Sequence, residues 1–151
     1  MEIRLEDVPA RRIGSLPHRG AYSQIGQVFP FVGQIAAAAG LAQETMAAVY
    51  YDHPGTTPEA ELRSAAAVVL PEGTPCPNGL EESELPAGKY LVAVYVGSYE
   101  GLNDAWTTVT GTEMERRGLN HSEGPAYEIY ENSGADVPES ELRTAIHVSV
   151  A

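Results

Sequence analysis

The second half of this 151-residue chain repeats the first. Pro58–Arg63 recurs as Pro138–Arg143 with five of six residues identical, at an offset of 80. Earlier matches follow in the same order: Arg19–Tyr22 aligns with Val96–Tyr99 at an offset of 77, and Gly40-Leu41 aligns with Gly118-Leu119 at 78. We attribute the drift of the offset to small loop insertions. Several matches in one order indicate an internal duplication.

Each half predicts the same β-α-β-β order of elements. Residues 90–96 are β-branched and aromatic and follow a Pro-Ala-Gly turn, which is typical of a strand. After each Gly-x-Tyr, apolar residues recur at spacings of three and four and stop at a glycine, as in a helix with a glycine at its end. The expected strands are 10–18, 46–52 and 63–70 in the first half, and 90–96, 126–131 and 143–150 in the second; the expected helices are 25–39 and 101–117.

Two such units can cover each other's apolar faces, so we predict an α+β fold. It would be one domain, 1–151, with two helices, antiparallel sheets, a pseudo-twofold axis and a groove where the repeats meet. The first repeat spans about 8–70 and the second about 88–150. The segment 71–87, rich in proline and acidic residues, is expected to be a surface connection, with Glu81, Glu82 and Glu84 as a solvated charge run.

Composition excludes several classes of protein. Nine basic residues against 21 acidic ones give a net charge of −12, which disfavours direct binding of nucleic acid, since that affinity comes mainly from Lys and Arg. No apolar run is long enough to cross a membrane, and the first residues lack a signal peptide, so we expect a cytoplasmic protein without a membrane partner. Cys76, the only cysteine, is expected to be a reduced surface thiol. The spacing of the four histidines predicts no metal site, and no cofactor motif is present.

A series of motifs, in order along the chain, resembles one known family. They are Ala48-Val49-Tyr50-Tyr51-Asp52-x-Pro54, Thr57-Pro58-Glu59-x-x-Leu62-Arg63, Gly88-Lys89-Tyr90, Gly97-x-Tyr99, Trp106, and Pro125-x-Tyr127-Glu128-x-Tyr130-x-Asn132. From Val8 to Val150 the chain is similar to the GyrI-like family, which includes the small DNA gyrase inhibitory protein and the effector-binding domains of AraC-type and multidrug-sensing MerR-type transcription factors. The resemblance implies the duplicated fold and a pocket between the repeats, often for lipophilic cations.

The resemblance also implies a role for one carboxylate. In the family, the Glu of the Pro-x-x-Glu-x-Tyr motif points into the pocket, and Glu128 is the matching residue here. The chain departs from the family near its end, where Ala145 and Ser149 replace a frequent acidic residue and a proline. A role for a second carboxylate there is therefore not expected.

Strand alternation adds the neighbours of this carboxylate. Glu128 and Tyr130 share one face of their strand, and their counterparts in the first half are Ala48 and Tyr50. We place Tyr50, Tyr130, Tyr95 and Trp106 at the groove, because the faces of aromatic rings attract desolvated cations. His18, the counterpart of Tyr95, is a further candidate. Each of these side chains could instead serve the core or the solvated surface, and sequence alone leaves that open.

Three functions fit these residues, the second and the third as what the family resemblance implies. The first is a stand-alone module that binds lipophilic cationic small molecules over a carboxylate floor. The second is a protein that inhibits DNA gyrase, or protects it from toxins, by direct contact. The third is a hydrolase that opens cyclopropane rings, with Glu128 as the catalytic group acting together with a pocket tyrosine. The first is the expectation we carry forward, because an enzyme would need a second catalytic group that the sequence does not identify.

Overall fold

The computed structural model describes residues 1–151, which form an α+β fold of antiparallel strands and helices. The chain divides into two compact units. The first unit is residues 9–87; the second unit is residues 1–8 together with 88–151. No helix is both long enough and apolar enough to span a lipid bilayer.

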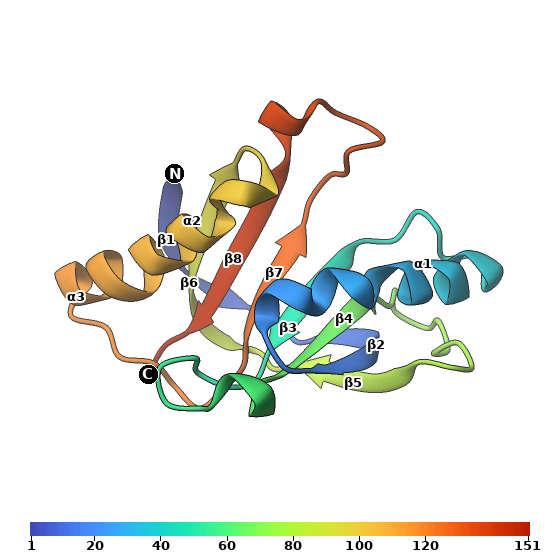
Figure 1. The fold of residues 1–151 in the computed structure, drawn as a ribbon, viewed down its shortest axis with the longest axis horizontal. Coiled ribbons are helices and arrows are strands. Elements are labelled where there is room, and N and C mark those ends of the chain that lie inside the picture. Colours follow the sequence, from blue (N-terminus) through green and yellow to red (C-terminus); the bar gives the residue numbers. More distant parts are fainter. The chain divides into compact units, whose positions relative to one another are not determined.

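The first unit has four antiparallel strands in the order β3-β4-β2-β5. They are β2 (Arg11–Arg19), β3 (Met46–Tyr50), β4 (Arg63–Val69) and β5 (Glu81–Leu85), with the 3₁₀ turns η1 (Tyr22–Gln27) and η2 (Glu59–Glu61). Helix α1 (Phe29–Ala38) packs on β4, where Val32 and Ala36 meet Ala66 and Val68 (Figure 1).

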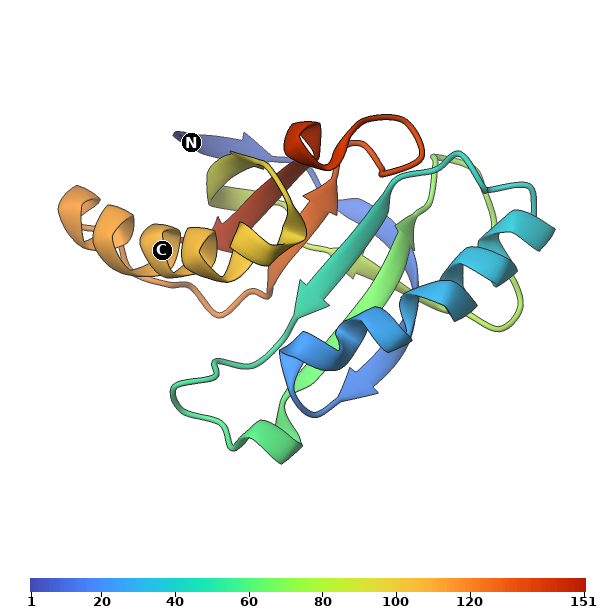
Figure 2. The same ribbon diagram turned by 45° about the horizontal axis from the view of Figure 1, so that its top comes forward.

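The second unit has the strand order β1-β6-β8-β7. Its strands are β1 (Glu2–Val8), β6 (Gly88–Val96), β7 (Ala126–Tyr130) and β8 (Arg143–Ser149), with the 3₁₀ turns η3 (Tyr99–Gly101) and η5 (Glu139–Glu141). One helical segment covers a face of β6 and β8 (Figures 1 and 2): it runs from α2 (Leu102–Thr107) through the π-helix η4 (Thr108–Glu113) to α3 (Met114–Arg117).

The segment ends where the sequence predicts. Gly118 has φ of 66°, a left-handed conformation that glycine adopts without strain and that often closes a helix. The buried residues beneath the segment come from both the strands and the helix, among them Leu91, Ile146, Val109 and Met114. This packing determines which face of α2 lies against the sheet.

Two strands were not expected. The predicted connector 71–87 is more than a surface connection, because Glu81–Leu85 forms β5 and pairs with β2. The first residues form β1, which pairs with β6. Both are edge strands with many charged side chains, so neither shows the apolar alternation that predicts a strand. The glutamates of β5 are exposed, as expected.

Candidate ligand-binding site

The centre of the candidate site is a buried carboxylate on β7. Only 3% of Glu128 is exposed. The Trp106 Nε1–H group donates to Glu128 Oε1 at 2.5 Å, and the Tyr130 hydroxyl donates to Glu128 Oε2 at 2.7 Å. Hydrogen bonds to an ionised acceptor are stronger than those between neutral groups, so these two donors stabilise the carboxylate and fix its orientation.

Strand pairing explains how these side chains meet. Glu128 lies opposite Ile146 and Tyr130 lies opposite Thr144 on β8. Ile146 belongs to the core beneath α2, so this is the face of the sheet that the helix covers. Trp106 reaches Glu128 from α2, and its ring also packs against the core.

Tyr95, on β6, lies opposite Thr144 from the other side. Its hydroxyl donates to the Ser98 carbonyl at 2.7 Å, so it supports the turn after its own strand. A Cβ added at Gly101 would collide with the Tyr95 hydroxyl, so glycine at this position leaves room for the hydrogen bond. The hydroxyl of Tyr95 is therefore already engaged.

Tyr99 is a site residue that the sequence reasoning did not select. Its ring lies 5.6 Å from that of Tyr130 in an edge-on arrangement, and 48% of the residue is exposed. Partial burial raises the pKa of Tyr99, and the negative charge of Glu128 raises it further. The negative charge of Glu128 thus acts on the ring of Tyr99, which is partly exposed to solvent. The alignment of Tyr99 with Tyr22 in the two halves is the sequence feature that could have indicated Tyr99 as a candidate.

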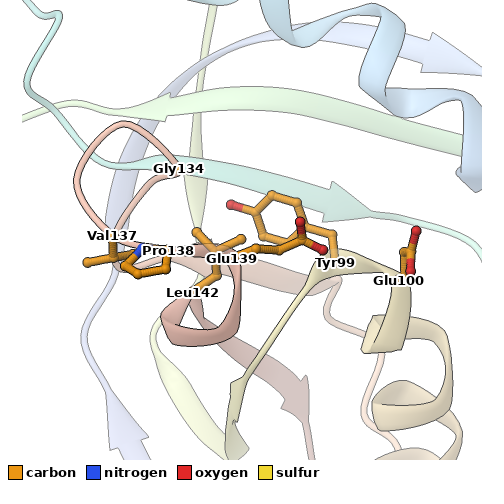
Figure 3. Close-up of a pocket in the computed structure, with 7 residues that line it drawn as sticks. All are labelled: Tyr99, Glu100, Gly134, Val137, Pro138, Glu139 and Leu142. Atoms are coloured by element: carbon orange, nitrogen blue, oxygen red, sulfur yellow. The ribbon is translucent and has the colours of Figure 1, made fainter.

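A hollow of about 480 Å³ opens beside Tyr99. Its lining is Tyr99, Glu100, Gly134, Val137, Pro138, Glu139 and Leu142 (Figure 3). Figure 3 shows Val137 and Pro138 at one end and Glu100 at the other, with Tyr99 and Glu139 between them. Tyr99 thus lines the hollow and also contacts Tyr130, the residue that donates a hydrogen bond to Glu128.

The remaining predicted residues lie in the first unit. The Tyr50 ring lies 4.7 Å from that of Tyr22, and His18 Nε2 lies 3.2 Å from the Ala21 carbonyl oxygen. At the offsets that relate the two halves of the sequence, the places of Glu128 and Trp106 are taken by Ala48 and Phe29. The structure therefore brings together Glu128, Tyr130 and Trp106, and the first unit has apolar counterparts for the carboxylate and its indole donor.

Comparisons with known proteins agree with this fold. A DNA gyrase inhibitor from Escherichia fergusonii is 30% identical over 91 residues, which are 58% of this chain and 59% of that protein, so the match spans less than two thirds of the relative. The solved EcmrR C-terminal domain has a TM-score of 0.78 at 18% identity, over 99% of this chain and 97% of that one. SAV2435, solved bound to tetraphenylphosphonium, has a TM-score of 0.72 at 13% identity, over 100% and 94%.

At these identities the solved structures show a shared fold. The family match is broader than the match to the curated relative, because the profile of the GyrI-like small molecule binding domain covers residues 1–151. The chain therefore belongs to the family of GyrI-like small molecule binding domains.

Proposed function

We propose that this protein binds lipophilic cations and that Glu128 supplies the charge that holds them. The observation that carries the proposal is a carboxylate with 3% exposure that accepts hydrogen bonds from the Trp106 indole and the Tyr130 hydroxyl. Removing a carboxylate from water is costly, and neutral donors reduce that cost without cancelling the charge. A cation bound nearby would stabilise the ionised carboxylate further.

Aromatic rings supply the second half of the recognition. Trp106 and Tyr130 both contact the carboxylate, and the ring of Tyr99 lies against that of Tyr130. The face of such a ring attracts a desolvated cation by about 0.5–2 kcal/mol. Rings also bury the apolar surface of the ligand, so the combination favours cations with large apolar substituents.

The hollow beside Tyr99 is the proposed route to this group. Glu128 is nearly inaccessible, so a ligand must displace the side chains that cover it. Tyr99 is the half-exposed ring between the hollow and Tyr130, and Glu100 and Glu139 give the hollow negative charge. That SAV2435, which shares the fold, was solved with tetraphenylphosphonium makes this cation the natural first probe.

Replacing Glu128 by Gln tests the proposal. Trp106 is the only tryptophan and touches Glu128, so its fluorescence reports on the site directly. We expect tetraphenylphosphonium to change this fluorescence saturably, and Glu128→Gln to weaken binding by about 10- to 100-fold, the loss of a charge interaction of a few kcal/mol.

The matched control is Glu59→Gln, which makes the same change of net charge at an exposed position of the first unit. It should bind like the unmodified protein. Equal affinity of the Glu128→Gln variant and the unmodified protein, with circular dichroism showing both folded, would contradict the proposal.

A second candidate function is inhibition of DNA gyrase. It is favoured by the relative named DNA gyrase inhibitor, with 30% identity over 91 residues. Inhibition of gyrase needs a protein partner and not an internal ligand. A gyrase supercoiling assay with the Glu128→Gln variant therefore distinguishes gyrase inhibition from cation binding. Inhibition that survives this substitution would be independent of the Glu128 site.

A further inference from the structure

Ser64 and Thr144 each carry a buried hydroxyl group without a hydrogen-bond partner. Ser64 is 2% exposed and Thr144 is 0% exposed, and the structure gives neither Ser64 Oγ nor Thr144 Oγ1 a partner. The residues are 80 apart, the offset that relates the two halves of the sequence. Buried polar groups are almost always paired in folded proteins, so each unpaired hydroxyl calls for an explanation.

Thr144 is next to the candidate site. It lies opposite Tyr130 on β7 and opposite Tyr95 on β6. Directly opposed residues in antiparallel strands have Cβ atoms only about 5 Å apart, so the hydroxyl of Thr144 stands between two tyrosine side chains. Both tyrosine hydroxyls donate elsewhere: Tyr130 to Glu128 and Tyr95 to the Ser98 carbonyl.

Thr144 also shares a face with the carboxylate. Glu128 lies opposite Ile146, two residues along β8 from Thr144, and residues two apart on a strand point to the same side. A free hydroxyl donor and a buried carboxylate acceptor are therefore on one face of adjacent strands. In the first unit the corresponding serine, Ser64, lies two residues from Ala66, opposite Ala48, so no carboxylate accompanies it.

We propose that Thr144 donates a hydrogen bond to the bound ligand, so that the site prefers lipophilic cations that carry a hydrogen-bond acceptor. This inference rests on the proposed function of Glu128. The two groups are complementary, because Glu128 meets the positive charge and Thr144 meets an ether or carbonyl oxygen. Valine at position 144 would fill nearly the same space without the unpaired hydroxyl, so the threonine destabilises the free protein and stabilises the complex.

A pair of matched cations tests the preference. The probes are (4-methoxyphenyl)triphenylphosphonium, which has an ether oxygen, and (4-ethylphenyl)triphenylphosphonium, which has similar size and no acceptor. Titrations follow the fluorescence of Trp106. We expect the unmodified protein to bind the methoxy compound about 3- to 10-fold more tightly, which corresponds to one hydrogen bond.

Thr144→Val should abolish this preference and leave the affinity for the ethyl compound unchanged. It should also raise the melting temperature by about 2–4 °C, because it removes an unpaired buried polar group. Ser64→Ala is the matched control: it removes the equivalent unpaired hydroxyl in the first unit and should leave the preference intact.

The outcomes separate this inference from the proposed function. A preference that disappears in Thr144→Val and persists in Ser64→Ala supports a hydrogen bond from Thr144 to the ligand. No preference in the unmodified protein, or an undiminished preference in Thr144→Val, overturns the inference, while Glu128-dependent binding of both compounds would still support the proposed function. Failure of every cation to bind overturns both.

Discussion

At the scale of the residue, the carboxylate and its indole donor form a coupled pair. The second unit has Glu128 with Trp106, and the first has Ala48 and Phe29 at the corresponding positions. A buried carboxylate without a donor is costly, and a buried indole N–H without an acceptor is costly too. Both groups are therefore either present together or replaced together by apolar residues.

A double-mutant cycle at these two positions tests the coupling. We expect Trp106→Phe and Glu128→Ala each to lower the free energy of unfolding by about 1–3 kcal/mol, since each removes one partner of a hydrogen bond to a buried carboxylate. The double variant reproduces the pair found in the first unit, and it should be more stable than the sum of the single losses by about 0.5–3 kcal/mol. Urea denaturation measures all four proteins. Additive losses would show that the two side chains are not coupled.

Sequence reasoning reached part of this site. Strand alternation places Glu128 and Tyr130 on one face, and the structure shows them hydrogen-bonded. The contact of Trp106 with Glu128 depends on how the helix lies on the sheet, which no local pattern gives. Tyr99 and Thr144 were missed because the sequence does not reveal an edge-on contact between rings or an unpaired hydroxyl. The groove between the repeats, the site roles of Tyr50 and His18 and the hydrolase alternative stay predictions.

At the scale of the element, a π-helix accounts for one step in the sequence offset. Val32 and Val109 are both fully buried and lie 77 apart, whereas Ala36 and Met114 are buried and lie 78 apart. The extra residue lies in η4, where the helix widens to a π turn, so an insertion in a loop is not needed to explain this step. The widened turn puts Met114 in the core, and Glu113 pairs with Arg116 and Arg117.

Removing one residue from each helix tests this explanation. Deletion of Gly111 should restore an ordinary α-helix in which Met114 follows Val109 by four residues, so the core contact remains. Deletion of Gly33, which lies between Val32 and Ala36 in α1, should rotate Ala36 and the residues after it by about 100° around the helix axis and so displace them from their present contacts with the core. We expect the Gly33 deletion to cost about 2 kcal/mol or more of unfolding free energy, and the Gly111 deletion to cost less than about 1 kcal/mol. Denaturation curves with equal losses would contradict the explanation.

The helices and six of the eight strands can be predicted from the spacing of apolar residues, because these elements are buried on at least one face. The edge strands β1 and β5 do not, since their exposed charged residues give no apolar pattern and only long-range pairing makes them strands. Both units contain a strand, a helical segment and two strands in this order; β5 follows them in the first unit, and β1 precedes them in the second. Their origin by duplication stays a prediction.

At the scale of the whole molecule, the dominant property is negative charge. Of the total of −12, the second unit carries −8, from 13 acidic and 5 basic side chains, and the first unit carries −4, from 8 and 4. Such a field attracts cationic ligands and basic protein surfaces and repels nucleic acid. Both candidate functions therefore share the same long-range electrostatics and differ in the short-range contacts they need.

Inhibition of gyrase, if it occurs by competition with DNA for a basic surface, should depend on this overall charge. We expect a supercoiling assay to show inhibition that weakens as the ionic strength rises from about 0.05 M to about 0.2 M, because exposed charges are increasingly screened. Neutralising Glu81, Glu82 and Glu84, which are exposed on β5, should reduce inhibition, whereas Glu128→Gln should leave it unchanged because Glu128 is buried. Supercoiling that proceeds equally with and without the protein would exclude gyrase as its target, and inhibition insensitive to salt would exclude charge competition as the mechanism.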